Sequence, residues 1–183
     1  MKFRLSYSGS LKSRNSSKTK DKWVLRKEFH EQLKELWTVH PTLASWINND
    51  EHFLIEKFGR SFRPLAVSGL HLFCSLEILF LRRGEPGKAI KRGDIDNRIK
   101  TLIDGLRLPQ SIEEMADIKN HFSEGEVIYC LLEDDDRILH FSVETDTLLK
   151  PKIGEEPQTQ ADVMLTVEVK PTLVTFDAVG FLS

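Results

Sequence analysis

The sequence predicts an α/β (α+β) fold, a small mixed β-sheet with helices packed on it. Two observations lead to this prediction. Segments in which apolar and polar residues alternate occur towards both ends of the chain, and segments with helical spacing lie between strand-like ones. A chain of 183 residues is long enough to bury one hydrophobic core, so we expect a single domain over residues 1–183.

The strand predictions depend on alternation. Phe3, Leu5 and Tyr7 alternate with polar neighbours, and valines and leucines alternate in the same way near the C-terminal end of the chain. The segment LHLFCSLEILFL becomes almost continuously apolar, which predicts a central strand covered on both faces. We expect strands over residues 2–8, 70–81, 127–133, 137–145 and 161–170.

The helix predictions depend on apolar residues three or four positions apart. This spacing predicts helices over residues 23–37 and 94–106, with Asp94 as the N-cap of the second, and a short helical piece after Pro41. Residues 111–125 are polar and acidic, which predicts a surface loop or a short helix. The two cysteines, Cys74 and Cys130, are far apart in apolar stretches, so we expect buried free thiols.

Positive charge is concentrated at the start of the chain. Nine of the 26 lysines and arginines fall within residues 1–27, which contain only one of the 28 acidic residues. A basic loop at about 9–22 and a basic segment after the strand at 70–81 are typical of phosphate-backbone binders, although solvated basic tails are also common. The residues expected to contact DNA are Lys12, Arg14, Lys18, Lys20, Lys22, Arg82, Arg83, Lys88, Lys91 and Arg92.

The hydropathy pattern argues against a membrane role. No apolar run approaches the roughly 20 residues that a membrane-spanning helix requires. The segment after Met1 is polar and basic where a signal peptide would be apolar, so we expect an intracellular, cytoplasmic protein.

Acidic residues form the most informative pattern, in GDIDNRIKTLID and LLEDDDRI. Asp94 and Asp96 lie two apart where a helix begins, and Asp134, Asp135 and Asp136 end a strand. Strand alternation would point Asp134 and Asp136 to one face and Asp135 to the other. Mg²⁺ prefers carboxylate oxygens, and nucleases use it to activate water and to neutralise charge on a phosphate.

Each acidic residue also has a purely structural interpretation. Asp94 can cap a helix, Asp96 and Asp104 can pair with Lys100, and the three aspartates at 134–136 can form a solvated turn. Several carboxylates close together nevertheless raise one another's pKa and destabilise the fold unless a cation is shared. Neither a zincin site, which needs a second histidine where Lys34 stands, nor an EF-hand fits the spacing.

At these residues the chain resembles the RusA family of Holliday junction resolvases. That family has Asp-x-Asp-Asn, a Lys three residues later, a further Asp, and then Asp-Asp-x-x-Ile/Val. The first part matches Asp94, Asp96 and Asn97, followed by Lys100 and Asp104 at the family's spacing. Asp134, Asp135 and Ile138 match the second part, and the resemblance covers about residues 60–170.

The resemblance implies a small mixed α/β fold and a homodimer with two neighbouring acidic sites. It also implies Mg²⁺ or Mn²⁺ as cofactor and cleavage of four-way DNA junctions. Asp94, Asp96 and Asp135 would be the essential metal ligands and catalytic carboxylates, and Lys100 the catalytic lysine. Asp134 would be a further, supporting metal-binding carboxylate, and Asn97 and Asp104 would support the site.

The chain departs from the family pattern in its long spacer between Asp104 and Asp134 and in its basic segment over residues 11–50. These departures leave the substrate preference open. Two other functions also stay open. One is a nucleic-acid-binding module without catalysis, in which the carboxylates are structural. The other is a related nuclease that acts on other branched or single-stranded DNA. The binding module alone does not explain why acids lie beside a basic segment, where they would repel phosphate unless a metal intervenes.

Overall fold

The computed structural model describes residues 1–13, 18–47, 52–82, 94–149, 160–173 and 178–181. Its elements are β1 (Lys2–Ser10), α1 (Thr19–Val39), α2 (Pro41–Trp46), β2 (Ile55–Lys57), β3 (Arg60–Ala66), β4 (Leu72–Arg82), α3 (Asp94–Leu106), the 3-10 helices η2 (Ile112–Met115) and η3 (Ile118–Asn120), β5 (Ile128–Leu132), η4 (Asp135–Arg137), β6 (Ile138–Thr147), β7 (Gln160–Pro171) and η5 (Val179–Phe181). In these stretches, no helix combines the length and apolar character needed to cross a bilayer.

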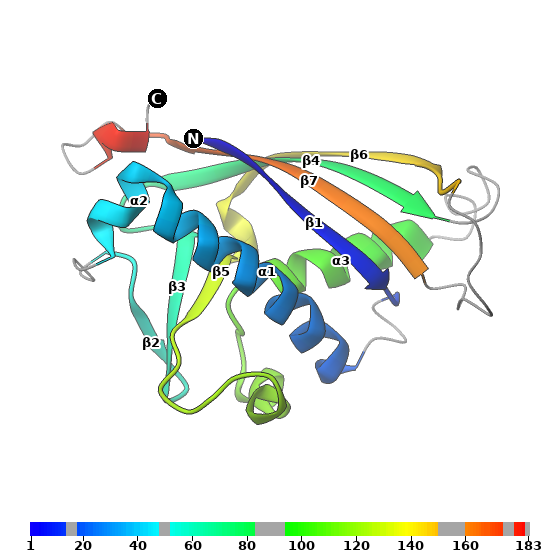
Figure 1. Cartoon of the computed structure of the whole chain (residues 1–183), viewed down its shortest axis with the longest axis horizontal. Coiled ribbons are helices and arrows are strands. Elements are labelled where there is room, and N and C mark those ends of the chain that lie inside the picture. Colours follow the sequence, from blue (N-terminus) through cyan, green and yellow to red (C-terminus); the bar gives the residue numbers. More distant parts are fainter. Residues whose placement is uncertain (14–17, 48–51, 83–93, 150–159, 174–177, 182–183) are drawn as a thin grey trace.

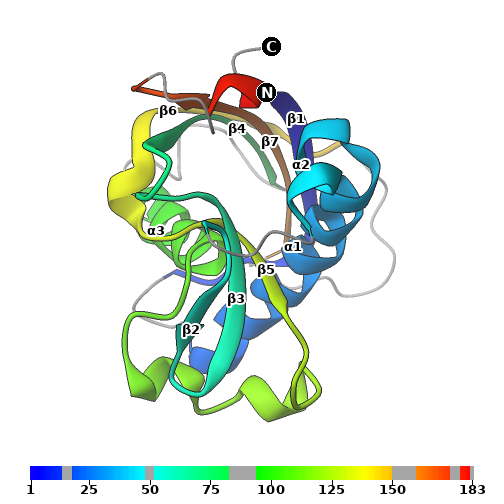
Figure 2. The ribbon, with the colours of Figure 1, turned by 90° about the vertical axis from the view of Figure 1, so that its left-hand side faces the viewer.

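The strands form two mixed sheets, and the α+β prediction is confirmed. A four-stranded sheet has the order β1-β7-β4-β6, in which only β4 and β6 run parallel. A three-stranded sheet has the order β2-β3-β5, with β3 and β5 parallel. Figure 1 shows the larger sheet above α1 and α3, and Figure 2 shows these two helices on either side of the molecule with the smaller sheet below them.

The main core lies between the four-stranded sheet and the helices. Alternate residues of β4 and β7 point inwards and are buried, as the alternation predicts. The expectation that β4 is covered on both faces is wrong, because Glu77 on its other face is exposed and Phe73 is only partly buried. On that face, Leu79 shares a pocket with Met164 and Glu144 of the neighbouring strands, and the Arg137 guanidinium lies 4.3 Å from the centre of the Phe73 ring.

Helices α1 and α3 pack closely because a glycine stands where they meet. A Cβ atom at Gly105 would lie 2.7 Å from the Cβ of Leu25, a distance that real side chains do not tolerate. The α3 bounds predicted from sequence match the structure. Helix α1 starts at Thr19, earlier than predicted, because Asp21 accepts a hydrogen bond from the Lys18 backbone N–H at 2.8 Å and closes the first turn.

A second core lies beneath the smaller sheet. Met115, Ile118 and Phe122 are buried there against Trp23 and Phe62. The predicted loop or short helix over 111–125 is confirmed as two 3-10 helices, but its apolar residues are structural rather than superficial. Both cysteines are free and buried, as expected.

Strands β2 and β3 were not predicted from sequence. They form a hairpin whose tight turn has positive φ at Phe58 (53°) and Gly59 (70°). Strand β3 contains Pro64 and the buried Arg63, whose guanidinium donates to the Ile47 carbonyl oxygen at 3.2 Å. A strand that buries an arginine and a proline has no alternating pattern to recognise.

Candidate active site

Helix α3 supplies one wall of the candidate site. Its buried side packs Leu102 and Leu106 into the core, while Asp96 and Lys100 are exposed. Residues four positions apart lie on one side of a helix, so Asp96, Lys100 and Asp104 form a row along α3. The helical rise of about 1.5 Å per residue spaces these residues by about 6 Å each.

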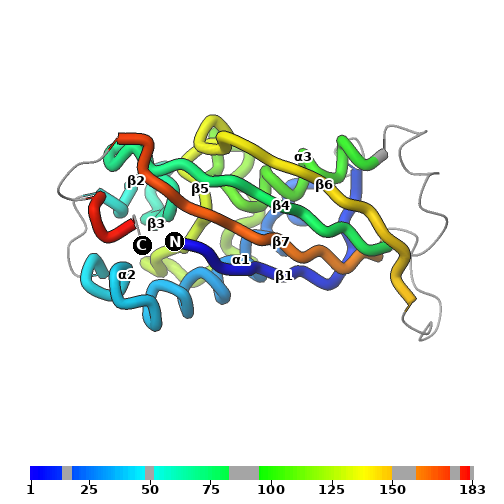
Figure 3. Tube along the Cα trace, turned by 90° about the horizontal axis from the view of Figure 1, so that it is seen from above, coloured from blue at the N-terminus to red at the C-terminus, as the bar shows by residue number. Residues whose placement is uncertain are grey.

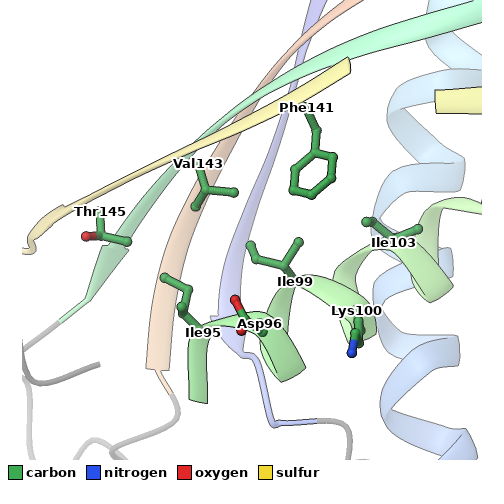
Figure 4. A pocket seen from close by; sticks show the side chains of 8 residues that line it. All are labelled: Ile95, Asp96, Ile99, Lys100, Ile103, Phe141, Val143 and Thr145. Carbon is green, nitrogen blue, oxygen red and sulfur yellow. The ribbon is translucent and has the colours of Figure 1, made fainter. Parts of the chain in front are cut away.

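Strand β6 supplies the opposite wall. Phe141, Val143 and Thr145 alternate along the strand and face α3, and Figure 4 shows Ile99 of α3 directed towards Phe141 and Val143. Because β6 is the last strand of its sheet in the described chain, its side chains meet α3 at the edge of the sheet. Figure 3 shows α3 running beneath β6 and β4.

Two adjoining cavities lie between these walls, and together we call them the α3–β6 groove. The apolar cavity, of about 490 Å³, is lined by Ile95, Asp96, Ile99, Lys100, Ile103, Phe141, Val143 and Thr145. The charged cavity, of about 380 Å³, is lined by Lys100, Ile103, Asp104, Arg107, Asp135, Ile138 and Phe141. Lys100, Ile103 and Phe141 line both, so the two cavities lie side by side.

Asp135 reaches the charged cavity from the turn that follows β5. Glu133 fixes the start of this turn, because its carboxylate accepts hydrogen bonds from the Ser68 N–H at 2.6 Å and from the Ser68 hydroxyl at 3.0 Å. Asp134 accepts the Asp135 N–H at 2.8 Å and caps η4. The expected strand alternation of the three aspartates is therefore wrong, since the chain has already left β5 and turned.

Asp104 is held in a partly buried network of ion pairs. Its carboxylate lies 2.7 Å from Lys22 Nζ and 2.8 Å from Arg107 Nη2. Burial by itself raises the pKa of Asp104, but the hydrogen bond from Lys22 and the charge of Arg107 outweigh that effect and hold the pKa below its ordinary value. Asp104 therefore has structural partners, although it lines the charged cavity.

Asp96 and Asp135 differ from the other aspartates whose side chains the structure describes. Within that set, their carboxylates alone make no hydrogen bond or ion pair. The engaged aspartates are Asp21, Asp104, Asp117, Asp134, Asp136, Asp146 and Asp162. Lys100 likewise forms no ion pair within the described chain. The free carboxylates are thus two of the three that were predicted to be essential metal ligands, and both line the groove.

The structure brings the predicted residues to one groove but not into one cluster. Asp96 lines the apolar cavity and Asp135 the charged one, and Lys100 connects them. Among the described side chains, no three of the types His, Cys, Asp and Glu are grouped as a metal site would need. Asp94 is the first residue of α3, and its side chain lies outside the described residues, while Asn97 lines neither cavity.

The predicted DNA-contacting residues fall into three groups. Arg14, Arg83, Lys88, Lys91 and Arg92 lie outside the described residues. Lys12 and Lys22 bind Asp21 and Asp104, and Lys22 stands on α1 rather than in the expected loop. Lys18 and Lys20 are exposed at the start of α1, and Arg82 ends β4.

Two residues of the groove were missed from sequence. Arg107 follows Asp104 by three positions, a spacing that favours an ion pair on a helix, so its pairing with Asp104 was predictable. Phe141 stands in an alternating strand, and alternation gives its face but not the fact that this face meets α3. Its side chain remains 52% exposed.

Comparison of the chain with protein-family models, with curated proteins and with solved structures finds no match. The resemblance to the RusA family therefore rests on the motif residues alone.

Proposed function

We propose that the protein is a Mg²⁺- or Mn²⁺-dependent endodeoxyribonuclease that hydrolyses phosphodiester bonds in four-way junctions or related branched DNA during recombination or repair. One observation supports this proposal most directly. Among the described aspartates, the two whose carboxylates have no protein partner are Asp96 and Asp135, and both line the groove that contains Lys100. Asp104, by contrast, is paired with Lys22 and Arg107 and serves the fold.

The donor chemistry of the groove fits a hard divalent cation. Asp96 and Asp135 offer carboxylate oxygens that no cation of the described chain neutralises, and Asp94 would complete the ligand set, with Asp134 in support. When bound, the cation would activate water and stabilise the charge that develops on the phosphate. Lys100 would place its ammonium against a phosphate oxygen, because no carboxylate of the described chain pairs with it. The apolar side chains of Ile99 and Phe141 would exclude water and strengthen these charge interactions.

The alternative is a nucleic-acid-binding module without catalysis, and one observation favours it. Among the described side chains, no three carboxylates gather in one place. In that case, Asp96 and Asp135 would be ordinary solvated surface residues. We place the nuclease first because unpaired acids in a DNA-binding groove would weaken binding unless a cation offsets them.

A cleavage assay separates these two functions. Purified protein is incubated with four-way, flap, linear duplex and single-stranded DNA of matched sequence, with Mg²⁺, with Mn²⁺ and with EDTA. We expect metal-dependent cleavage of the branched substrates. Tight binding of junctions without cleavage in either metal would favour the binding module, and cleavage that persists in EDTA would contradict the metal-dependent mechanism.

We further propose a cytoplasmic location and, as the resemblance implies, a homodimer. Strand β6 pairs only with β4 in the described chain, so its other edge can receive a second copy. Leu139 and Phe141 on this strand are 62% and 52% exposed. Sedimentation of the wild type should give a dimer and Leu139→Glu a monomer, whereas a monomeric wild type would contradict the homodimer.

A further inference from the structure

The charged cavity is lined by two cations as well as two acids. Arg107 and Lys100 line it together with Asp104 and Asp135. Neither Arg107 nor its partners Arg26 and Glu114 belong to the motif that led to the proposed function. The proposed metal site therefore does not explain why Arg107 and its charged partners lie at this cavity.

Five ionised side chains form one network that reaches the cavity at Asp104 and Arg107. Three of them are cations and two are carboxylates, so the network carries one excess positive charge. Arg107 Nη2 lies 2.8 Å from Asp104 and 3.1 Å from Glu114, and Arg26 Nη2 lies 3.2 Å from Glu114. Lys22 completes the network through Asp104.

The hydrogen bonds of Arg107 fix its guanidinium and leave one donor unused. A guanidinium has five N–H groups. Two of them, on Nε and Nη2, bind Asp104, the other Nη2 hydrogen meets Glu114, and Nη1 donates once to the Leu108 carbonyl oxygen at 2.9 Å. One Nη1 hydrogen thus has no partner among these bonds. These four hydrogen bonds, to three residues, hold the group in a defined orientation at the wall of the cavity.

The other two cations of the network, Arg26 and Lys22, cannot bind a ligand in the cavity. Arg26 is 1% exposed and stacks 4.7 Å from the Trp23 ring, and Lys22 lines neither cavity of the groove. Their charges help to offset Asp104 and Glu114, so the network as a whole keeps one positive charge, and Arg107 is the one of its three cations that lines the cavity. Lys100, with no ion pair of its own, adds a second cation to the same wall.

We propose that Arg107 and Lys100 form a subsite for a backbone phosphate of the bound nucleic acid, across the charged cavity from Asp135. This inference rests on the proposed function for the identity of the ligand. Arg107 is a binding residue here, held in place by Asp104, and the spacing of Asp104 along α3 reflects this positioning role. A guanidinium with a free N–H and a nearby ammonium provide the donors that a phosphodiester accepts.

The test compares two variants that remove the same charge from the network. Arg107→Gln leaves Lys22 and Arg26 to balance the two carboxylates, so we expect it to fold. Lys22→Gln removes one cation that does not line the cavity and is the matched control. Arg107→Lys keeps a point charge at the wall. Circular dichroism melts check the fold of each variant.

Binding of a labelled four-way junction is measured by anisotropy in Ca²⁺ over a range of salt concentrations. For Arg107→Gln we expect affinity about tenfold lower at about 0.1 M salt and a slope of log affinity against log salt smaller by about 1. Arg107→Lys and Lys22→Gln should keep the wild-type slope. A scan of junctions with single neutral methylphosphonates should reveal a position that weakens the wild type but not Arg107→Gln.

The subsite would be overturned if Arg107→Gln kept both the salt slope and the methylphosphonate profile of the wild type. It would also be overturned if Lys22→Gln flattened the salt slope as much as Arg107→Gln, because binding would then depend on the overall positive charge and not on a contact with Arg107. If Arg107→Gln does not fold, two other results can overturn the subsite. One is a methylphosphonate scan in which no position weakens binding by the wild type. The other is a salt slope that is flattened in folded Arg107→Lys. The outcome for the proposed function is separate. A wild type that shows the Arg107 contact in Ca²⁺ but cuts no DNA in Mg²⁺ or Mn²⁺ retains the subsite and loses the nuclease.

Discussion

Lys22 Nζ lies 2.7 Å from Asp104 Oδ2, an ion pair that joins the start of α1 to the end of α3 beside the α3–β6 groove. Both side chains are mostly shielded from solvent, at 17% and 14% exposure. The pair links a residue expected to contact DNA with one expected to support the metal site. The ion pair therefore gives a structural role to two residues that the sequence pattern had linked to function. Variants of these residues should affect stability, so stability and cleavage can be tested separately.

We predict that Asp104→Asn lowers the free energy of unfolding by about 3 kcal/mol, because it leaves Lys22 and Arg107 short of a buried counter-charge. Asp136→Asn is the matched control. Asp136 pairs with Arg137 at the surface, where the loss should be at most about 1 kcal/mol. Urea denaturation of both variants measures the difference, and equal losses would mean that the Asp104 network does not stabilise the fold.

The same network predicts acid sensitivity. The pKa of Asp104 is lowered in the folded state, so its stabilisation is complete above the unfolded carboxyl pKa of about 4 and is lost as pH falls through the folded value. The Asp104→Asn variant should therefore lose less stability than the wild type between pH 5 and the acid-unfolding region.

Asp96 and Lys100 should affect cleavage and leave the fold intact, because neither side chain has a partner to lose in the described chain. We expect Asp96→Asn and Lys100→Ala to keep the wild-type melting temperature and to bind junctions in Ca²⁺. Cleavage in Mg²⁺ should fall by about 10²- to 10³-fold, with Asp96→Asn the more severe. Glu144→Gln, an unpaired exposed carboxylate facing away from the groove, should cleave like the wild type. An Asp96→Asn variant as fast as the wild type would refute the assigned site.

Periodicity predicted much of the fold. The α3 bounds, the first strand and the last strand depend on apolar spacing within one element, and spacing is visible in the sequence. The division into two sheets depends on which strands pair. Strand β3 has no alternating pattern in the sequence, because it buries Arg63 and Pro64. Such pairing is decided by contacts far apart in the chain, which a local pattern does not record.

The site shows the same division. Helical spacing placed Asp96, Lys100 and Asp104 in one row, as the structure has them. It could not tell that Lys22 neutralises Asp104, because Lys22 approaches from α1, which is far from α3 in the sequence. It also could not place Asp135, because the chain turns at Asp134 instead of continuing as a strand. Residue types and spacing identified the candidates, and tertiary contacts separated the structural ones from those free to bind.

At the basic start of the chain, we predict that neighbouring lysines differ in how much they contribute to DNA binding and to stability. Lys18 and Lys20 are exposed, whereas Lys22 is bound to Asp104. If the first two contact DNA phosphates, then Lys18→Ala with Lys20→Ala should reduce the slope of log affinity against log salt by about 2 and leave the fold unchanged. Lys22→Ala should keep the slope and lower the melting temperature. An unchanged slope in the double variant would identify the arm as a solvated segment.

The last prediction concerns His30, a fully buried side chain that joins α1 to β5. Its Nδ1 accepts the Tyr129 backbone N–H at 3.0 Å, so the neutral ring carries its proton on Nε2. Burial is the main cause that lowers the pKa of His30 below its ordinary value. Protonation would put a second proton on Nδ1, facing the Tyr129 N–H from which Nδ1 now accepts a hydrogen bond, and would place a charge beside the Phe122 ring. The Glu126 carboxylate, 3.5 Å from Nε2, favours this charge but does not outweigh the effect of burial on the pKa.

The sign of the pH effect follows from this lowered pKa. The unfolded chain binds the proton more readily, so the contribution of His30 to stability is complete above about pH 6.5 and is lost as pH falls towards the folded pKa. Each unit of lowering corresponds to about 1.4 kcal/mol. We expect the free energy of unfolding of the wild type to decrease from pH 7.5 to pH 5.5. His30→Gln can still accept the Tyr129 N–H but cannot titrate, so its decrease should be smaller. Identical pH profiles for the two proteins in urea denaturation would show that His30 does not titrate between the folded and unfolded states.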